Sequence, residues 1–83
     1  MGILTDMTIV VKHYHSSNMN SIGQIIKARR KELGLTQHTL ALLSQVGINT
    51  IVSIERGSKS PSIDTLTKVA DVLGLDVKLE VKD

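Results

Sequence analysis

The sequence predicts a mainly α fold, a compact domain of four short helices followed by one β-strand. Apolar residues recur at three- and four-residue spacing over most of residues 21–73, as on one face of a helix. Glycines at positions 34, 57 and 74 interrupt this spacing, and helices are expected to end there. After Gly74 the pattern becomes a strict alternation of apolar and charged residues, which is typical of a half-buried strand.

Composition limits the size of this fold and its surroundings. A chain of 83 residues makes one small domain, and the core must be aliphatic because Tyr14 is the one aromatic residue. The absence of cysteine excludes disulfides and thiolate metal sites. No apolar run is long enough to span a membrane, and the first residues lack the layout of a signal peptide. We therefore expect a cytoplasmic protein without a membrane partner.

Residues 1–20 differ from the rest and are expected to form an N-terminal extension. Thr8–His15 is rich in β-branched residues and suits an edge strand, and Ser16–Asn18 is a polar loop signal. Met19 stands directly before a helix start, so one interpretation begins the biological chain there. The other makes the extension a short arm that pairs with another chain or touches DNA. We favour a disordered or loosely packed tail.

The first helix is expected from Ser21, with Asn20 or Ser21 as its cap, and Gly34 supplies a left-handed stop. One face carries Ile22, Ile25, Ile26, Arg29 and Leu33.

Two further helices are expected within Leu35–Gly57, at about Gln37–Ser44 and Ile48–Arg56. Thr36 can cap the earlier one, because its hydroxyl accepts from backbone N–H groups that lack partners. The apolar sides of the two helices carry Leu40, Ala41 and Leu43, and then Ile48, Ile51 and Ile54. Two short helices around a tight turn form a helix-turn-helix, which holds the second helix outward toward the major groove of DNA.

The fourth helix should follow the loop Ser58–Pro61, with Ser62 as its cap and Asp64 complementing the positive end of the helix dipole. Its apolar stripe is Leu66, Val69, Ala70 and Leu73, and Gly74 ends it. We assign residues 21–74 to the helix-turn-helix domain.

The last residues, 75–83, are expected to form a dimerisation strand. Leu75, Val77, Leu79 and Val81 alternate with charged residues. A lone strand leaves its backbone groups unpaired, so it needs a neighbour. The same strand of a second copy can supply one, as an antiparallel pair across a two-fold axis. Residues 8–11 are the alternative neighbour, within or between chains.

Several motifs spread over the domain carry a family resemblance: Leu35-Thr36-Gln37, Leu40-Ala41, Val46, Thr50-Ile51, Ile54-Glu55-Arg56-Gly57 and Pro61-Ser62. Together they resemble the Cro/phage-repressor (Xre-type) DNA-binding family. The resemblance implies a phage-repressor-like fold and a sequence-specific regulator, a repressor of transcription, acting on double-stranded DNA. As a homodimer it would bind a pseudo-palindromic operator. The alternating tail also resembles the HipB-like antitoxin branch, which represses its own operon and binds a HipA-like kinase toxin.

Base contacts are expected from the outward face near the start of the second helix of the motif, where it enters the groove. The candidates are Gly47, Ile48, Asn49, Val52 and Ser53. Asn49 can bond to adenine through two hydrogen bonds, a contact of about 1–3 kcal/mol. For Ile48 we favour contact with a thymine methyl group. For Val52 two interpretations stay open: a contact with a thymine methyl group or a partner protein, and an ordinary exposed apolar side chain. The face carries no Arg, Lys or Gln, so one copy should bind weakly.

Phosphate contacts are expected on both sides of this face, from Thr36 and Gln37 and from Arg56, Ser58, Lys59 and Ser60. The resemblance implies that Gln37 bonds a phosphate and braces base-contacting side chains. It also implies a salt bridge between Arg30 and Glu55 that orients the second helix of the motif. Some of the cluster Lys27, Arg29, Arg30 and Lys31 should reach phosphates as well.

Enzyme function is not expected. His13 and His15 could share one face of a strand, but no carboxylate stands at a metal-ligand spacing from them. The glycines form no phosphate-binding loop, and no nucleophile has a base at a familiar spacing. We therefore expect no catalytic residues, no metal and no cofactor. The remaining alternative is a protein-interaction module that keeps the helix-turn-helix fold and binds DNA weakly.

Overall fold

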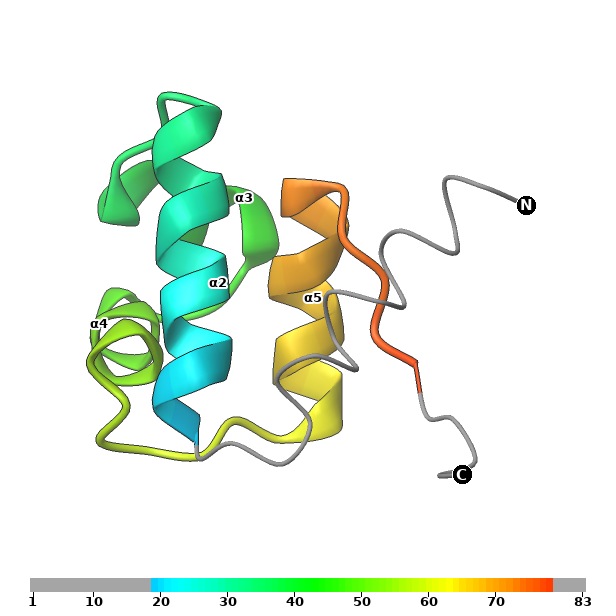
Figure 1. Ribbon diagram of the computed structural model, residues 1–83. Helices are drawn as coiled ribbons and strands as arrows, with labels where there is room; N and C mark the ends of the chain where they lie inside the picture. The colour runs from blue at the N-terminus through cyan, green and yellow to red at the C-terminus, as the bar shows by residue number, and fades with distance from the viewer. Residues whose placement is uncertain (1–18, 79–83) are drawn as a thin grey trace.

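The computed structural model describes residues 19–78, which form four α-helices (Figure 1). In chain order these are α2 Met19–Glu32, α3 Gln37–Ser44, α4 Ile48–Arg56 and α5 Ile63–Leu73. No strand occurs among the described residues, so this part of the chain is an all-α domain. The edge strand expected at Thr8–His15 lies outside the described residues.

The bounds of α3, α4 and α5 agree with the sequence prediction, whereas the predicted start of α2 is wrong. Thr36 and Ser62 each accept a hydrogen bond at 3.0 Å from the backbone N–H three residues later, as expected of caps. Helix α2 begins at Met19, so Asn20 and Ser21 lie inside its first turn. Because a first turn tolerates polar residues, the sequence alone defines such a start poorly.

The turn between α3 and α4 passes through a left-handed backbone conformation. Gln45 has φ of 58° and ends α3, and its N–H turns back to the carbonyl groups of Ala41 and Leu42. Glycine usually occupies such a position because a Cβ atom crowds the following carbonyl oxygen. The helix-turn-helix of this chain therefore contains a local strain at Gln45.

An aliphatic core fills the space between the four helices. Its buried residues are Ile26, Leu40, Ala41, Ile51, Ile54, Val69 and Leu73. Helix α2 packs chiefly on α4, and Gly23 makes the close approach of these helices possible. A Cβ atom at Gly23 would overlap the backbone carbonyl oxygen of Ile54. The position of α4 against the domain thus depends on a missing side chain in α2.

Two leucines expected on apolar faces are exposed instead. Leu43 is 58% exposed and Leu33 is 43% exposed. The inward face of α3 consists of Leu40, Ala41 and Ser44, so Leu43 lies beyond its edge. The buried hydroxyl of Ser44 donates to the carbonyl oxygen of Leu40 at 2.6 Å, which satisfies it. Leu33 follows the last residue of α2 and no longer shares the helical face.

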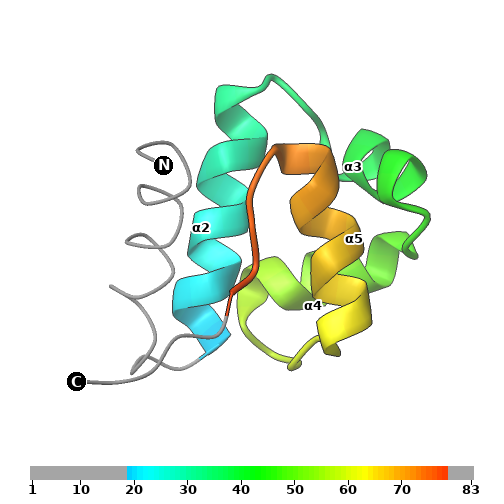
Figure 2. The ribbon, with the colours of Figure 1, turned by 90° about the vertical axis from the view of Figure 1, so that its right-hand side faces the viewer.

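The C-terminal segment does not form the predicted strand where the structure describes it. Residues 75–78 turn back after α5 and run alongside it (Figure 2). Leu75 packs against the core and Val77 is half-buried, while Asp76 and Lys78 are exposed. The alternation of burial is therefore present, but the hydrogen bonds of a strand need a second strand, and residues 19–78 of one chain supply none. Leu79 and Val81 lie outside the described residues.

Candidate nucleic-acid interface

Helix α4 has a buried face toward the core and an outer face that carries the expected base contacts. Ile51, Ile54 and Glu55 are buried, Asn49 is exposed, and Val52 and Ser53 are half-buried. Gly47 precedes the helix without a side-chain cap, so the first N–H groups of α4 are not bound by a capping side chain. The outer face can therefore present one amide, one hydroxyl and one branched apolar group to a ligand.

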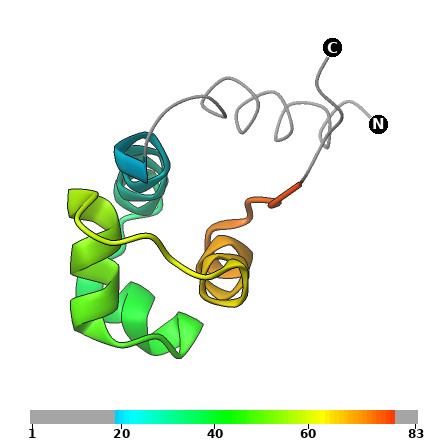
Figure 3. The ribbon, with the colours of Figure 1, turned by 90° about the horizontal axis from the view of Figure 1, so that it is seen from below.

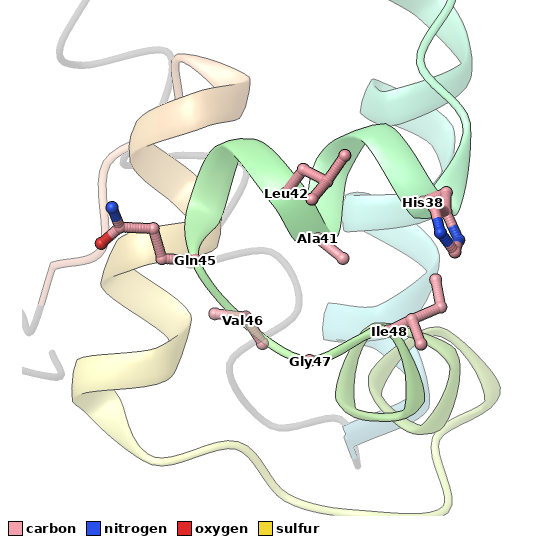
Figure 4. A pocket seen from close by; sticks show the side chains of 7 residues that line it. All are labelled: His38, Ala41, Leu42, Gln45, Val46, Gly47 and Ile48. Carbon is pink, nitrogen blue, oxygen red and sulfur yellow. The ribbon is translucent and has the colours of Figure 1, made fainter.

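Ile48 differs from the other expected base contacts. It is half-buried and packs against the core. It also lines a shallow hollow of about 430 Å³ between α3 and α4, together with residues of both helices and the turn (Figure 4). The side chain of His38 lies next to that of Ile48, and both line this hollow together with Leu42 (Figure 4). The side chain of Ile48 is thus partly used for packing.

Arg30 and Glu55 form a bidentate, buried ion pair between α2 and α4. Arg30 Nε donates to Glu55 Oε2 at 2.7 Å, and Arg30 Nη2 donates to Glu55 Oε1 at 3.0 Å. The remaining terminal nitrogen, Nη1, donates to the carbonyl oxygen of Leu35 at 2.8 Å, just before α3. The hydrogen bond to Glu55 raises the pKa of the Arg30 guanidinium above its usual value, against the opposite effect of burial. One guanidinium therefore joins α2 to both helices of the motif, through Glu55 of α4 and through Leu35 just before α3.

Gln37, the first residue of α3, extends this network. Its Nε2 donates to Glu55 Oε1 at 3.1 Å. In the structure Gln37 therefore bonds to the Glu55 carboxylate of α4. The resemblance implied that it would brace base-contacting side chains instead. One N–H of the Gln37 amide is used in this bond, and the second N–H stays available to donate to another acceptor. A phosphate oxygen is such an acceptor, and the bond to Glu55 holds the amide in place.

The other expected phosphate contacts are placed in different ways. Thr36 uses its hydroxyl to cap α3 and donates to Thr39 at 3.0 Å. Arg56, Ser58, Lys59 and Ser60 are exposed at the end of α4 and in the loop after it. This loop crosses one end of the domain to reach α5 (Figure 3). Its exposed cation and hydroxyl groups are therefore available to contact a phosphate backbone.

The basic cluster of α2 does not form one patch. Arg30 points to Glu55, and Arg29 Nε donates to the carbonyl oxygen of Leu73 at 2.9 Å, at the end of α5. Lys27 and Lys31 are exposed. Sequence reasoning missed the contact of Arg29, because its partner is 44 residues away along the chain and is a backbone atom. The residue type at position 73 does not predict such a contact, because every residue has a backbone carbonyl oxygen.

Comparison with known proteins assigns the family. A helix-turn-helix family of the Xre/Cro type matches residues 26–79. The chain therefore belongs to this family of DNA-binding, non-enzymatic transcriptional regulators. Among residues 19–78, no helix is long and apolar enough to cross a membrane, and no cluster of potential ligands suits a metal ion.

Three relatives show how the likeness is distributed. The chain is 44% identical over 57 residues to the immunity repressor protein of Bacillus phage phi105, and the aligned region covers 69% of this chain and 40% of the repressor. It is 44% identical over 50 residues to an HTH-type transcriptional regulator of Methanothermobacter thermautotrophicus, covering 60% of this chain and 72% of that protein. The regulator YqaF of Bacillus subtilis is 33% identical over 58 residues, covering 70% and 76% of the two chains. The chain thus spans less than half of the phage repressor and most of the two regulators.

Proposed function

We propose that this protein represses transcription by binding a pseudo-palindromic operator as a homodimer. The observation that carries the proposal is the Arg30–Glu55–Gln37 network, which holds α4 against α2 and α3. In this arrangement Asn49 is exposed on the outer face of α4 and does not pack against the core. The similarity to a phage immunity repressor supports repression as the outcome of binding.

In this proposal the outer face of α4 selects the sequence and its flanks bind phosphates. Asn49 bonds to a base edge, and Val52, Ser53 and the exposed part of Ile48 contact neighbouring bases, with Gly47 allowing the backbone to approach. Phosphate oxygens accept from the free N–H of Gln37 and from the first amides of α3 next to Thr36. The loop after α4 binds the backbone on the other flank through Arg56, Ser58, Lys59 and Ser60.

Dimerisation completes the proposed site. Strands from two copies, centred on Leu75, Val77, Leu79 and Val81, would pair across a two-fold axis. Two copies of α4 would then lie about one helical turn of DNA apart, roughly 34–36 Å. Doubling the contacts compensates for an outer face with few donors and acceptors.

A selection from random duplex DNA followed by titration tests the proposal. We expect an enriched inverted repeat whose affinity exceeds that of unrelated DNA by at least about 10³-fold and falls with salt. The Asn49→Ala variant should lose the preference at one base pair of each half-site. Truncation after Gly74 should convert the dimer to a monomer in a sizing experiment. A truncated chain that stays dimeric would remove the proposed strand pairing.

A protein-interaction module is the second candidate, and one observation favours it. Leu42 is 73% exposed beside the hollow between α3 and α4, and Leu43 is 58% exposed. Contiguous exposed apolar surface is a mark of protein contact sites. If the random-duplex selection enriches no sequence, this candidate takes first place. The antitoxin role with a HipA-like toxin rests on the alternating tail alone, so co-purification with such a toxin is its test.

A further inference from the structure

Arg29 joins the last turn of α2 to the end of α5, where the C-terminal segment leaves the domain. The side chain starts on α2 and crosses to the end of α5, where Nε donates to the carbonyl oxygen of Leu73 at 2.9 Å. Leu73 itself is fully buried. The same guanidinium bonds to Glu32 of its own helix at 3.4 Å, which helps to fix its orientation.

The charge of Arg29 suits this position. The last turn of α5 carries no basic residue of its own. The carbonyl groups at a helix end lack partners within the helix and carry partial negative charge, so a cation there is favourable. Arg29 supplies that cation from a neighbouring helix and thereby links α2 to the end of α5.

The chain changes direction directly beside this contact. Gly74 has φ of 70°, and a Cβ atom at this residue would lie 3.6 Å from Arg29 Nη2. The next N–H, of Leu75, donates to the carbonyl oxygen of Ala70 at 2.9 Å, and the side chain of Leu75 packs against the core. Three interactions around Gly74 therefore define the direction in which residues 75–78 leave α5 (Figure 2).

We propose that Arg29 is a positioning residue that sets the spacing between the two DNA half-sites. This inference rests on the proposed dimer, in which residues 75–81 join the two copies. If the exit direction from α5 is fixed, the two α4 helices stand at one separation and match one spacer length. If it is free, the second domain samples many positions, and its effective concentration at any one half-site falls.

The test uses full-length chain and synthetic DNA. Two inverted copies of the half-site found by selection are separated by spacers that increase one base pair at a time. Binding to this series is compared for the unaltered chain, Arg29→Met, Arg29→Lys and the control Lys68→Met, which removes an exposed positive charge on α5. Affinity for a single half-site measures DNA binding by one domain alone, and a melting curve measures the stability of each variant.

We expect the unaltered chain and the Lys68→Met variant to prefer one spacer length. Arg29→Met should bind a single half-site with an affinity within about twofold of normal. At the preferred spacer length its affinity should fall about tenfold, and it should bind DNA with adjacent spacer lengths almost equally well. Arg29→Lys keeps the charge and should recover part of the preference. If Arg29→Met keeps the normal preference, or loses single half-site binding by the same factor, the inference is wrong. An unaltered chain that shows no spacer preference removes the proposed dimer and the inference with it.

Discussion

Gln37 and Glu55 are joined by a hydrogen bond of 3.1 Å that connects the first turn of α3 to the last turn of α4. Glu55 accepts from Arg30 at the same oxygen, so a single carboxylate holds together the start of α3, the end of α4 and the last turn of α2. The geometry of the candidate interface therefore depends on a buried ion pair as well as on apolar packing.

Glu55→Ala should lower stability and DNA affinity together, because it leaves the Arg30 guanidinium buried without its partner. The side chains of Arg30 and Glu55 are 10% and 3% exposed, and breaking a buried pair costs about 3–5 kcal/mol. Chemical denaturation and a DNA titration measure the two effects. Arg30→Met combined with Glu55→Ala should recover part of the stability. Lost binding at unchanged stability would instead assign Glu55 a direct role on DNA.

Gln37→Ala should weaken DNA binding more than it weakens the fold. The bond to Glu55 is partly buried and contributes about 1 kcal/mol, whereas the variant also loses the free N–H that we assign to a phosphate. We expect about a tenfold loss of affinity that is equal for operator and unrelated DNA. His38→Ala, which changes an exposed side chain in the same turn, is the matched control. A loss confined to operator DNA would show that Gln37 acts on base recognition.

Gln45→Gly should stabilise the domain by about 0.5–1 kcal/mol, since glycine adopts φ near 58° without a Cβ clash. The melting temperature should then rise by roughly 4–8 °C for each kcal/mol of added stability. Gly34→Ala is the opposite control, because Gly34 has φ of 71° and a Cβ atom there meets no neighbour within 4 Å. It should destabilise through backbone strain alone. A melting temperature unchanged by Gln45→Gly would refute the strain at this turn.

Lys59→Ala and Asn49→Ala should separate backbone contact from base recognition. Removing Lys59 should weaken binding to all sequences alike and lower the slope of affinity against salt by about one. Removing Asn49 should leave that slope unchanged and reduce the discrimination at one base pair by about 1–3 kcal/mol. Fluorescence anisotropy at several salt concentrations measures both. Identical behaviour of the two variants would contradict the division of the interface.

The sequence predicted the elements whose signals are local. Thr36 and Ser62 are caps three residues from their partners, and so α3 and α5 could be placed to the residue. The contacts that the sequence missed are long-range or go to backbone atoms, as for Arg29 with Leu73. Leu43 was misplaced because a helix of eight residues has room for only a narrow buried face.

The site was predictable to a similar extent. The family resemblance implied the pair of Arg30 and Glu55, which composition or spacing alone would not have found. It did not reveal that Gln37 would bond to Glu55, because that contact depends on the angle between α3 and α4. The strand after Gly74 stays a prediction, since its hydrogen bonds would come from a second chain.

Position 23 of α2 has room for glycine and for no other amino acid. Its neighbour across the helix contact is the backbone carbonyl of Ile54, which no change of rotamer can move aside. Any side chain at position 23 must therefore push the carboxyl end of α4 away from α2. In a library of variants selected only for binding DNA, position 23 should return glycine alone, while exposed neighbours such as Gln24 accept most residues. A residue that makes no side-chain contact would then be among the most restricted in the whole chain.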